Sequence, residues 1–146
     1  MSRNKKMLKD KDILSFYQYL YEYEAKIKNE YGRFCIDNNN VNQFVTGNNI
    51  FLGSINNKND IRKSTNYDNF ILWEEGAINS KSNKDRAHAL LRRIRNAFAH
   101  GKLIDKKSGF FELSDYDDKK QKDTLHGIIS YQLLYELIDV LKETKK

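Results

Sequence analysis

Arg95, Asn96 and His100 lie within six residues of one another and are of types that could cleave RNA together. An imidazole exchanges protons near neutral pH, so it could take the proton of a ribose 2′-hydroxyl or give one to the departing 5′-oxygen. A guanidinium can hold a phosphate while charge builds on it, and an amide can orient either group without adding charge. This chemistry would require no metal ion.

The spacing predicts a helix that presents Asn96 and His100 on one face. Residues four apart are separated by only about 40° around a helix, whereas Arg95 would lie about 140° from His100. Arg92 continues the line of Asn96 and His100 by one further turn. The apolar stripe that should face the core on the other side consists of Ala87, Leu90, Leu91, Ile94 and Phe98.

This helix is expected over residues 84–100, with Asn83 as its N-cap and Gly101 just past its end. His100 would then be at the exposed C-terminal end. From its position alone it could equally be a helix cap or a surface group, because function is decided by the surrounding site and not by one residue.

Positive charge is concentrated in the same region. Residues 84–107 contain eight basic and two acidic residues, an excess equal to the net charge of +6 of the whole chain. A charged helix face can simply be solvated, but arginines grouped around a histidine favour a phosphate partner. We therefore take Arg86, Arg92, Arg93 and Lys102 as candidate RNA-binding residues.

Elements before the basic helix are expected to be helical or irregular. Helical spacing of apolar residues predicts a long amphipathic helix over residues 8–31, whose aromatics are more typical of a core or a dimer interface than of base stacking. Residues 37–69 are rich in Asn and predict an irregular insertion, which could hide a short helix or cover a site. Residues 69–78, including Phe70 and Trp73, predict a short helix.

After Gly101 the pattern changes to short strands. Residues 103–113 contain two apolar clusters around a glycine turn and predict a small β-hairpin. Residues 114–123 are polar and predict a solvated loop, which would contain Asp115, Asp117 and Asp118. A last amphipathic helix is expected from Leu125 to Leu141.

Composition limits the remaining possibilities. The chain has 146 residues, which suits a single domain, and its one cysteine, Cys35, favours a reducing cytoplasmic compartment. No stretch approaches the roughly 18 apolar residues of a membrane helix. His88 and His126 lack partners at ligand spacing and are expected at the surface or at helix ends, so we expect neither a metal nor a cofactor.

The run from Leu91 to Gly101, with the pattern R-N-x-x-x-H, resembles the signature of the HEPN superfamily. The hairpin and last helix that follow resemble small HEPN proteins of plasmids and phage defence. The resemblance implies a single, mostly α, HEPN-like helical bundle with a small β-hairpin between the motif helix and the last helix. It also implies a homodimer that cuts RNA without metal, leaving a 2′,3′-cyclic phosphate, with Arg95, Asn96 and His100 as catalytic residues.

The expected function is therefore a metal-independent endoribonuclease of toxin–antitoxin or anti-phage defence, with RNA as substrate and an antitoxin or regulatory protein as a further partner. A homodimer is also expected because each copy offers one such histidine for a reaction that moves two protons. One branch of these toxins carries a modified Tyr two residues after the histidine, where this chain has Lys102. The alternatives are a non-catalytic HEPN-like module that binds RNA or protein, and an inert structural subunit with Arg95 in an ion pair.

Overall fold

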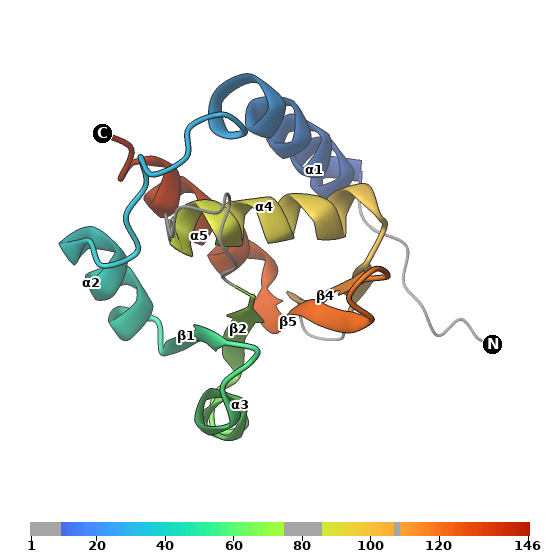
Figure 1. Ribbon diagram of the computed structural model, residues 1–146. Coiled ribbons are helices and arrows are strands. Elements are labelled where there is room, and N and C mark those ends of the chain that lie inside the picture. The colour runs from blue at the N-terminus through green and yellow to red at the C-terminus, as the bar shows by residue number, and fades with distance from the viewer. Residues whose placement is uncertain (1–9, 75–85, 107–108) are drawn as a thin grey trace.

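The computed structural model describes residues 10–74, 86–106 and 109–146, and Figure 1 shows their arrangement. Three helical segments come before or between the first strands: α1 (Asp10–Glu22), which continues as the π-helix η1 (Tyr23–Ile27), α2 (Asn39–Gly47) and α3 (Lys58–Ser64). The later helices are α4 (Arg86–Ala99) and α5 (Tyr131–Lys142). The strands are β1 (Ile50–Ser54), β2 (Asn69–Trp73), β3 (Leu103–Asp105), β4 (Phe110–Asp117) and β5 (Lys122–Ser130).

The prediction of a mostly helical bundle is wrong, because the five strands form one mixed sheet in the order β1-β2-β5-β4-β3. β1 and β2 pair in parallel, and every other neighbouring pair is antiparallel. In Figure 1, α1, α4 and α5 lie above this sheet and α3 lies below it. The protein therefore has an α/β architecture in which helices cover a sheet.

The amino-terminal strands come from segments that were expected to be irregular or helical. Residues 37–69 are not an irregular insertion, since they contain α2, β1 and α3. Phe70 and Trp73 lie on strand β2 and not on a short helix, because this segment pairs on both sides, with β1 and β5, and is buried. A strand enclosed in this way has a continuous apolar run and no alternation. Ala77 and Ile78 of the predicted helix lie outside the described residues.

The predicted hairpin is confirmed, but it is part of a larger antiparallel unit. Leu103 pairs with Leu113 and Asp105 with Phe111, as expected for two strands around a turn. Residues 114–123 are not a solvated loop, because β4 continues to Asp117 and β5 begins at Lys122. The last helix begins at Tyr131, so Leu125 belongs to a strand.

The predicted helix that carries the candidate residues is confirmed as α4, and helical structure over the first segment is confirmed as α1 and η1. Gly101 has a φ of +66°, the left-handed conformation that ends a helix and favours glycine. α4 packs on β2, β4 and β5, while α1 packs against α4 through rings such as Phe16 and Phe98. The apolar stripe of α4 is fully or almost fully buried, which leaves one face of its C-terminal half exposed.

In the described part of the chain, no helix combines the length and apolar character that crossing a membrane requires.

Candidate functional site

His100 is held by a buried carboxylate at the end of α4. Its Nδ1 lies 2.9 Å from Oδ1 of Asp115, whose side chain is only 6% exposed, whereas the imidazole is 54% exposed. Asp115 is on the face of β4 that points toward α4, in the same alternation as Phe111 and Leu113. A backbone hydrogen bond from Ser114 N–H to the Lys102 carbonyl fixes this strand beside the turn after α4.

This pair arranges His100 for proton transfer. A carboxylate only accepts hydrogen bonds, so the imidazole donates its Nδ1 hydrogen to Asp115. Nε2 then remains available on the exposed side of the ring to accept a proton or, in the charged imidazole, to donate one. A histidine oriented by a buried carboxylate is the arrangement that general acid–base catalysis uses on several unrelated folds.

Asn96 and His100 line one open pocket of about 300 Å³, together with side chains of β4, β5 and the turn between them. The strand side of the pocket includes Asp115, Tyr116 and Thr124, and Lys119 contributes a cation from the turn. The predicted placement of Asn96 and His100 on one helix face thus leads to a shared cavity. The pocket combines the imidazole of His100, the amide of Asn96, two cations and three carboxylates; the cations are Arg93 and Lys119, and the carboxylates are Asp115, Asp117 and Asp118.

Arg95 lies beside this pocket, and its side chain points away from the pocket toward η1. Its Nη1 donates to Asn96 Oδ1 at 3.1 Å, and its Nη2 lies 3.2 Å from Oε2 of Glu24 on η1. The guanidinium carbon is 5.8 Å from the centre of the Tyr23 ring. Arg95 is therefore connected to the pocket through Asn96 while its charge is balanced by a surface glutamate.

Arg93, a candidate RNA-binding residue, lines the same pocket as Asn96 and His100 and also makes structural contacts. It is buried, and its Nη2 lies 3.0 Å from Oε1 of Glu74, while Nε donates to the Glu74 carbonyl. Burial lowers the pKa of the Arg93 guanidinium, and the charge of Arg92 adds to this effect, while Glu74 opposes both. Lys120, in the turn between β4 and β5, and Lys122, at the start of β5, contact the same carboxylate. Arg93 thus fastens α4 to the end of β2.

The other predicted basic residues are spread along α4. Arg86 lies over the Trp73 ring at 5.3 Å, at the opposite end of the helix and roughly 20 Å along its axis from His100, by the usual rise per residue. Arg92 is half-buried one turn before Asn96, and Lys102 is exposed just after Gly101. Arg92 and Lys102 are therefore nearer to His100 along the chain than Arg86 is.

Asp115 is a functional candidate that the sequence does not indicate, because the polar composition of residues 114–123 predicts a loop. The signal that could have found it is the alternation of Phe111, Leu113 and Asp115, which continues the hairpin pattern by one more inward-facing position. His88 also differs from expectation: it is fully buried and not at the surface. His126 is partly exposed on β5, with Nε2 3.7 Å from Oε2 of Glu112.

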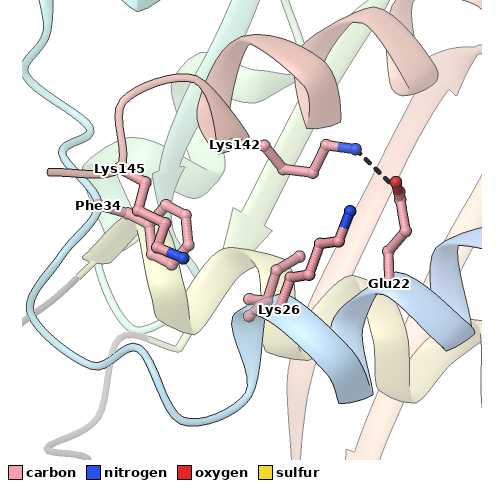
Figure 2. A pocket seen from close by; sticks show the side chains of 6 residues that line it. Glu22, Lys26, Phe34, Lys142 and Lys145 are labelled. Carbon is pink, nitrogen blue, oxygen red and sulfur yellow. Dashed lines mark hydrogen bonds and ion pairs between the residues drawn. The ribbon is translucent and has the colours of Figure 1, made fainter.

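A second pocket, of about 210 Å³, lies between η1 and α5, and Figure 2 shows its lining. Lys145 lies beside Phe34, and Lys26 and Lys142 lie at the other side of the pocket, where Lys142 reaches Glu22 at 2.8 Å. Burial disfavours the ammonium form, but the hydrogen bond and charge of Glu22 raise the pKa of Lys142 above its ordinary value. Two of the lysines of this pocket are paired: Lys142 with Glu22 and Asp139, and Lys145 with Glu30. This pocket joins two helices and offers no proton-transfer group comparable to His100.

Among the residues that the structure describes, no group of three His, Cys, Asp or Glu side chains is arranged to hold a metal ion.

The comparison with protein families agrees with the motif and its setting. The sequence model of the family described as HEPN pEK499 p136 matches residues 5–145. Because the match covers nearly the whole chain, the protein belongs to this family, and the resemblance to the HEPN superfamily is confirmed. Neither the curated proteins nor the solved structures include a match to the chain.

Proposed function

We propose that this protein is a metal-independent endoribonuclease whose active site is completed by a second copy of the chain. The observation that carries the proposal is the contact of 2.9 Å between His100 Nδ1 and the buried Asp115 carboxylate, in a pocket shared with Asn96. Membership of a HEPN family and the positive charge of the α4 region support RNA as the substrate.

The proposed reaction is attack of a ribose 2′-oxygen on the neighbouring phosphorus, with cleavage of the bond to the 5′-oxygen. His100 Nε2 of one copy takes the proton of the 2′-hydroxyl. The protonated His100 of the second copy gives a proton to the departing 5′-oxygen. Arg95 stabilises the charge that builds on the phosphate, and Asn96 orients the phosphate or the arginine. The products are a 2′,3′-cyclic phosphate and a free 5′-hydroxyl.

A homodimer supplies the second proton-transfer group, since the pocket of one copy contains a single histidine among its lining residues. The exposed face at the end of α4 carries Arg92, Arg95, Asn96 and His100 around the small side chain of Ala99. On the side of α1 opposite the residues that pack on α4, Leu14, Tyr17 and Tyr21 have exposed fractions of 68%, 66% and 72%. Three large apolar or aromatic side chains on one helix face favour a protein interface.

We place this activity in toxin–antitoxin or anti-phage defence in the cytoplasm, with an antitoxin or regulatory protein as a further partner. Support for this role is the family membership and the HEPN motif alone. Lys102 stands where one branch of HEPN toxins has a modified tyrosine, so the proposal does not include control by that modification.

The experiment is to incubate the purified protein with total RNA in EDTA and to test the product ends for a 2′,3′-cyclic phosphate. His126→Ala is a matched control for His100→Ala, because both histidines are partly exposed and contact a carboxylate. We expect cleavage by the wild type and His126→Ala but not by His100→Ala. Cleavage by folded His100→Ala at the wild-type rate would refute the proposal.

A second candidate function is a non-catalytic module that binds RNA. The observation in its favour is the excess positive charge of residues 84–107, which attracts RNA while Arg95 stays paired with Glu24. Such a module would bind RNA with a steep salt dependence and would leave it intact. The total-RNA experiment separates the two functions, since only the ribonuclease generates cyclic phosphate ends.

A further inference from the structure

Glu24 contacts two cations, Arg95 and Lys28, beside the candidate active site, and its carboxylate occupies a position that could hold an anion. We propose that Arg95 and Lys28 form a subsite for an RNA backbone phosphate, and that Glu24 occupies this subsite when RNA is absent. This inference rests on the proposed function and adds to it a new binding residue, Lys28, and an internal competitor, Glu24.

The contacts of Glu24 resemble those of a bound anion. One carboxylate oxygen, Oε2, lies 3.2 Å from Arg95 Nη2, and the other, Oε1, lies 3.3 Å from Lys28 Nζ. The exposed fractions of the three side chains are 47% for Glu24, 33% for Arg95 and 53% for Lys28. Solvent therefore reaches the whole cluster, and an incoming phosphate can approach both cations.

The backbone beneath this cluster is held by buried side chains, so the segment that carries Glu24 and Lys28 stays next to Arg95. Tyr23 is buried next to Glu24, and its ring supports the Arg95 guanidinium. His88 Nε2 lies 3.0 Å from the carbonyl oxygen of Ile27 and 3.2 Å from that of Lys28. These contacts fix η1, a π-helix, and π-helical turns often occur at functional sites.

Positive charge exceeds negative charge at the cluster. Arg92 lies one turn before Asn96 on α4, and its charge acts on Tyr23 together with that of Arg95. Burial raises the pKa of the Tyr23 hydroxyl to about 12, although both arginines act to lower it. Because Arg95 and Lys28 both contact Glu24, and the charge of Arg92 reaches Tyr23 next to it, replacing Glu24 with a phosphate of the same charge leaves the cluster able to attract further phosphates.

The subsite is joined to the pocket through Arg95. Nη1 of this arginine donates to Asn96 Oδ1, and Asn96 lines the pocket with His100. A phosphodiester carries one negative charge and two free oxygens, as a carboxylate does, so it can accept from the same two cations. Exposed ion pairs contribute little free energy, so displacing Glu24 costs little, while the other phosphates of an RNA strand add attraction.

The test measures binding of a fluorescent 2′-O-methyl oligoribonucleotide, which lacks the attacking hydroxyl and cannot be cut. We compare Glu24→Gln and Lys28→Gln with Glu112→Gln and Lys106→Gln. The control pair is matched because Lys106 Nζ lies 3.5 Å from Oε1 of Glu112 in a similar ion pair. Glu112 alternates with the buried residues of β4 and so faces away from α4.

We expect Glu24→Gln to bind about two- to fivefold more tightly than the wild type, the range of a lost exposed ion pair, and Glu112→Gln to bind as the wild type does. Lys28→Gln should bind more weakly and should reduce the slope of log affinity against log salt by about 0.7, the value for one phosphate of a single strand. Lys106→Gln should leave both quantities unchanged.

The inference is overturned if the Glu24 and Glu112 variants bind alike, if the Lys28 and Lys106 variants bind alike, or if wild type and Glu24→Gln both fail to bind. Cleavage of unmodified RNA by the wild type is scored separately. If the wild type does not cleave but the four binding results hold, the phosphate subsite stands and the ribonuclease proposal falls.

Discussion

The two ends of α4 each carry a histidine, and the two histidines have opposite surroundings. His88, near the start of the helix, is fully buried among the rings of Tyr23, Tyr31 and Phe34. His100, at the other end, is half exposed and has a carboxylate behind it. One helix thus uses the same residue type first as a packing group that holds η1 and then as a candidate for proton transfer.

The arginines of α4 show the same division. Arg93 is buried against Glu74. Arg95, two residues later, is partly exposed, forms an ion pair with Glu24 and donates a hydrogen bond to Asn96. Residue type does not distinguish these roles, but two residues apart on a helix are about 200° apart, so the two arginines face different neighbours. Burial and the partner across the interface distinguish them, so substitutions in the two regions should affect different measurements.

The largest effect is expected at the exposed end. His100→Ala should lower the rate of RNA cleavage by about 10²- to 10⁴-fold, the usual contribution of one acid–base group. Its melting temperature should fall less than that of a variant of the buried Arg93, because the ring of His100 is half exposed, although the buried Asp115 carboxylate loses the donor of one hydrogen bond. Single-turnover cleavage and circular dichroism melting provide the two measurements, and a large loss of stability would break the comparison.

Arg93→Met should act in the opposite way, on stability. Removing one partner of a buried ion pair costs about 3–5 kcal/mol in general, and we expect the lower part of this range because Lys120 and Lys122 still contact Glu74. Urea unfolding measures the change. Arg92→Met, at the half-buried neighbouring position, is the control and should cost less than about 1 kcal/mol.

His88→Ala should destabilise the protein by about 2–3 kcal/mol, because it removes a fully buried ring and its contact with the carbonyls of Ile27 and Lys28. Cleavage per folded molecule should remain at the wild-type level at a temperature where the variant is folded. If cleavage is instead lost as in His100→Ala, the division of α4 into a packing end and a reactive end is wrong.

Asp115→Asn tests whether the carboxylate behind His100 contributes to the reaction. An amide cannot replace the carboxylate as a purely accepting partner of Nδ1, so we expect kcat to fall about 10- to 100-fold, less than for loss of the imidazole itself. KM for RNA should change little, since Asp115 is buried behind His100. Glu112→Gln, on the opposite face of β4, should leave kcat unchanged.

The smallest expected effect is the change of the free energy of unfolding with pH that Glu74 causes. Burial disfavours the charged form of Glu74, but Lys122, Lys120 and Arg93 lower its pKa below the ordinary value. A carboxylate whose pKa is lower in the folded state than in the unfolded state stabilises the protein at pH values above its unfolded-state pKa. This stability is lost as the pH falls through the folded-state pKa. The free energy of unfolding should therefore decrease between neutral pH and acid more in the wild type than in Glu74→Gln. Equal slopes for both proteins would contradict this assignment.

Much of the candidate site could be predicted from the sequence because it depends on local order. Helical periodicity and the glycine after the helix define α4 and the common face of Asn96 and His100, and these signals lie within one short segment. The hairpin of β3 and β4 has a similar local signal in its glycine turn. The HEPN motif is contained in the same stretch.

Only the tertiary structure decided which distant residues meet. Phe70 pairs with Phe51 and Ile128, partners far away in the chain, so no local pattern distinguishes the buried strand β2 from a helix. The contacts of His100 with Asp115, of Arg93 with Glu74 and of Arg95 with Glu24 likewise join separate elements. Residue type determined what chemistry is possible at these positions, and packing determined which side chains are buried as supports and which remain exposed to react.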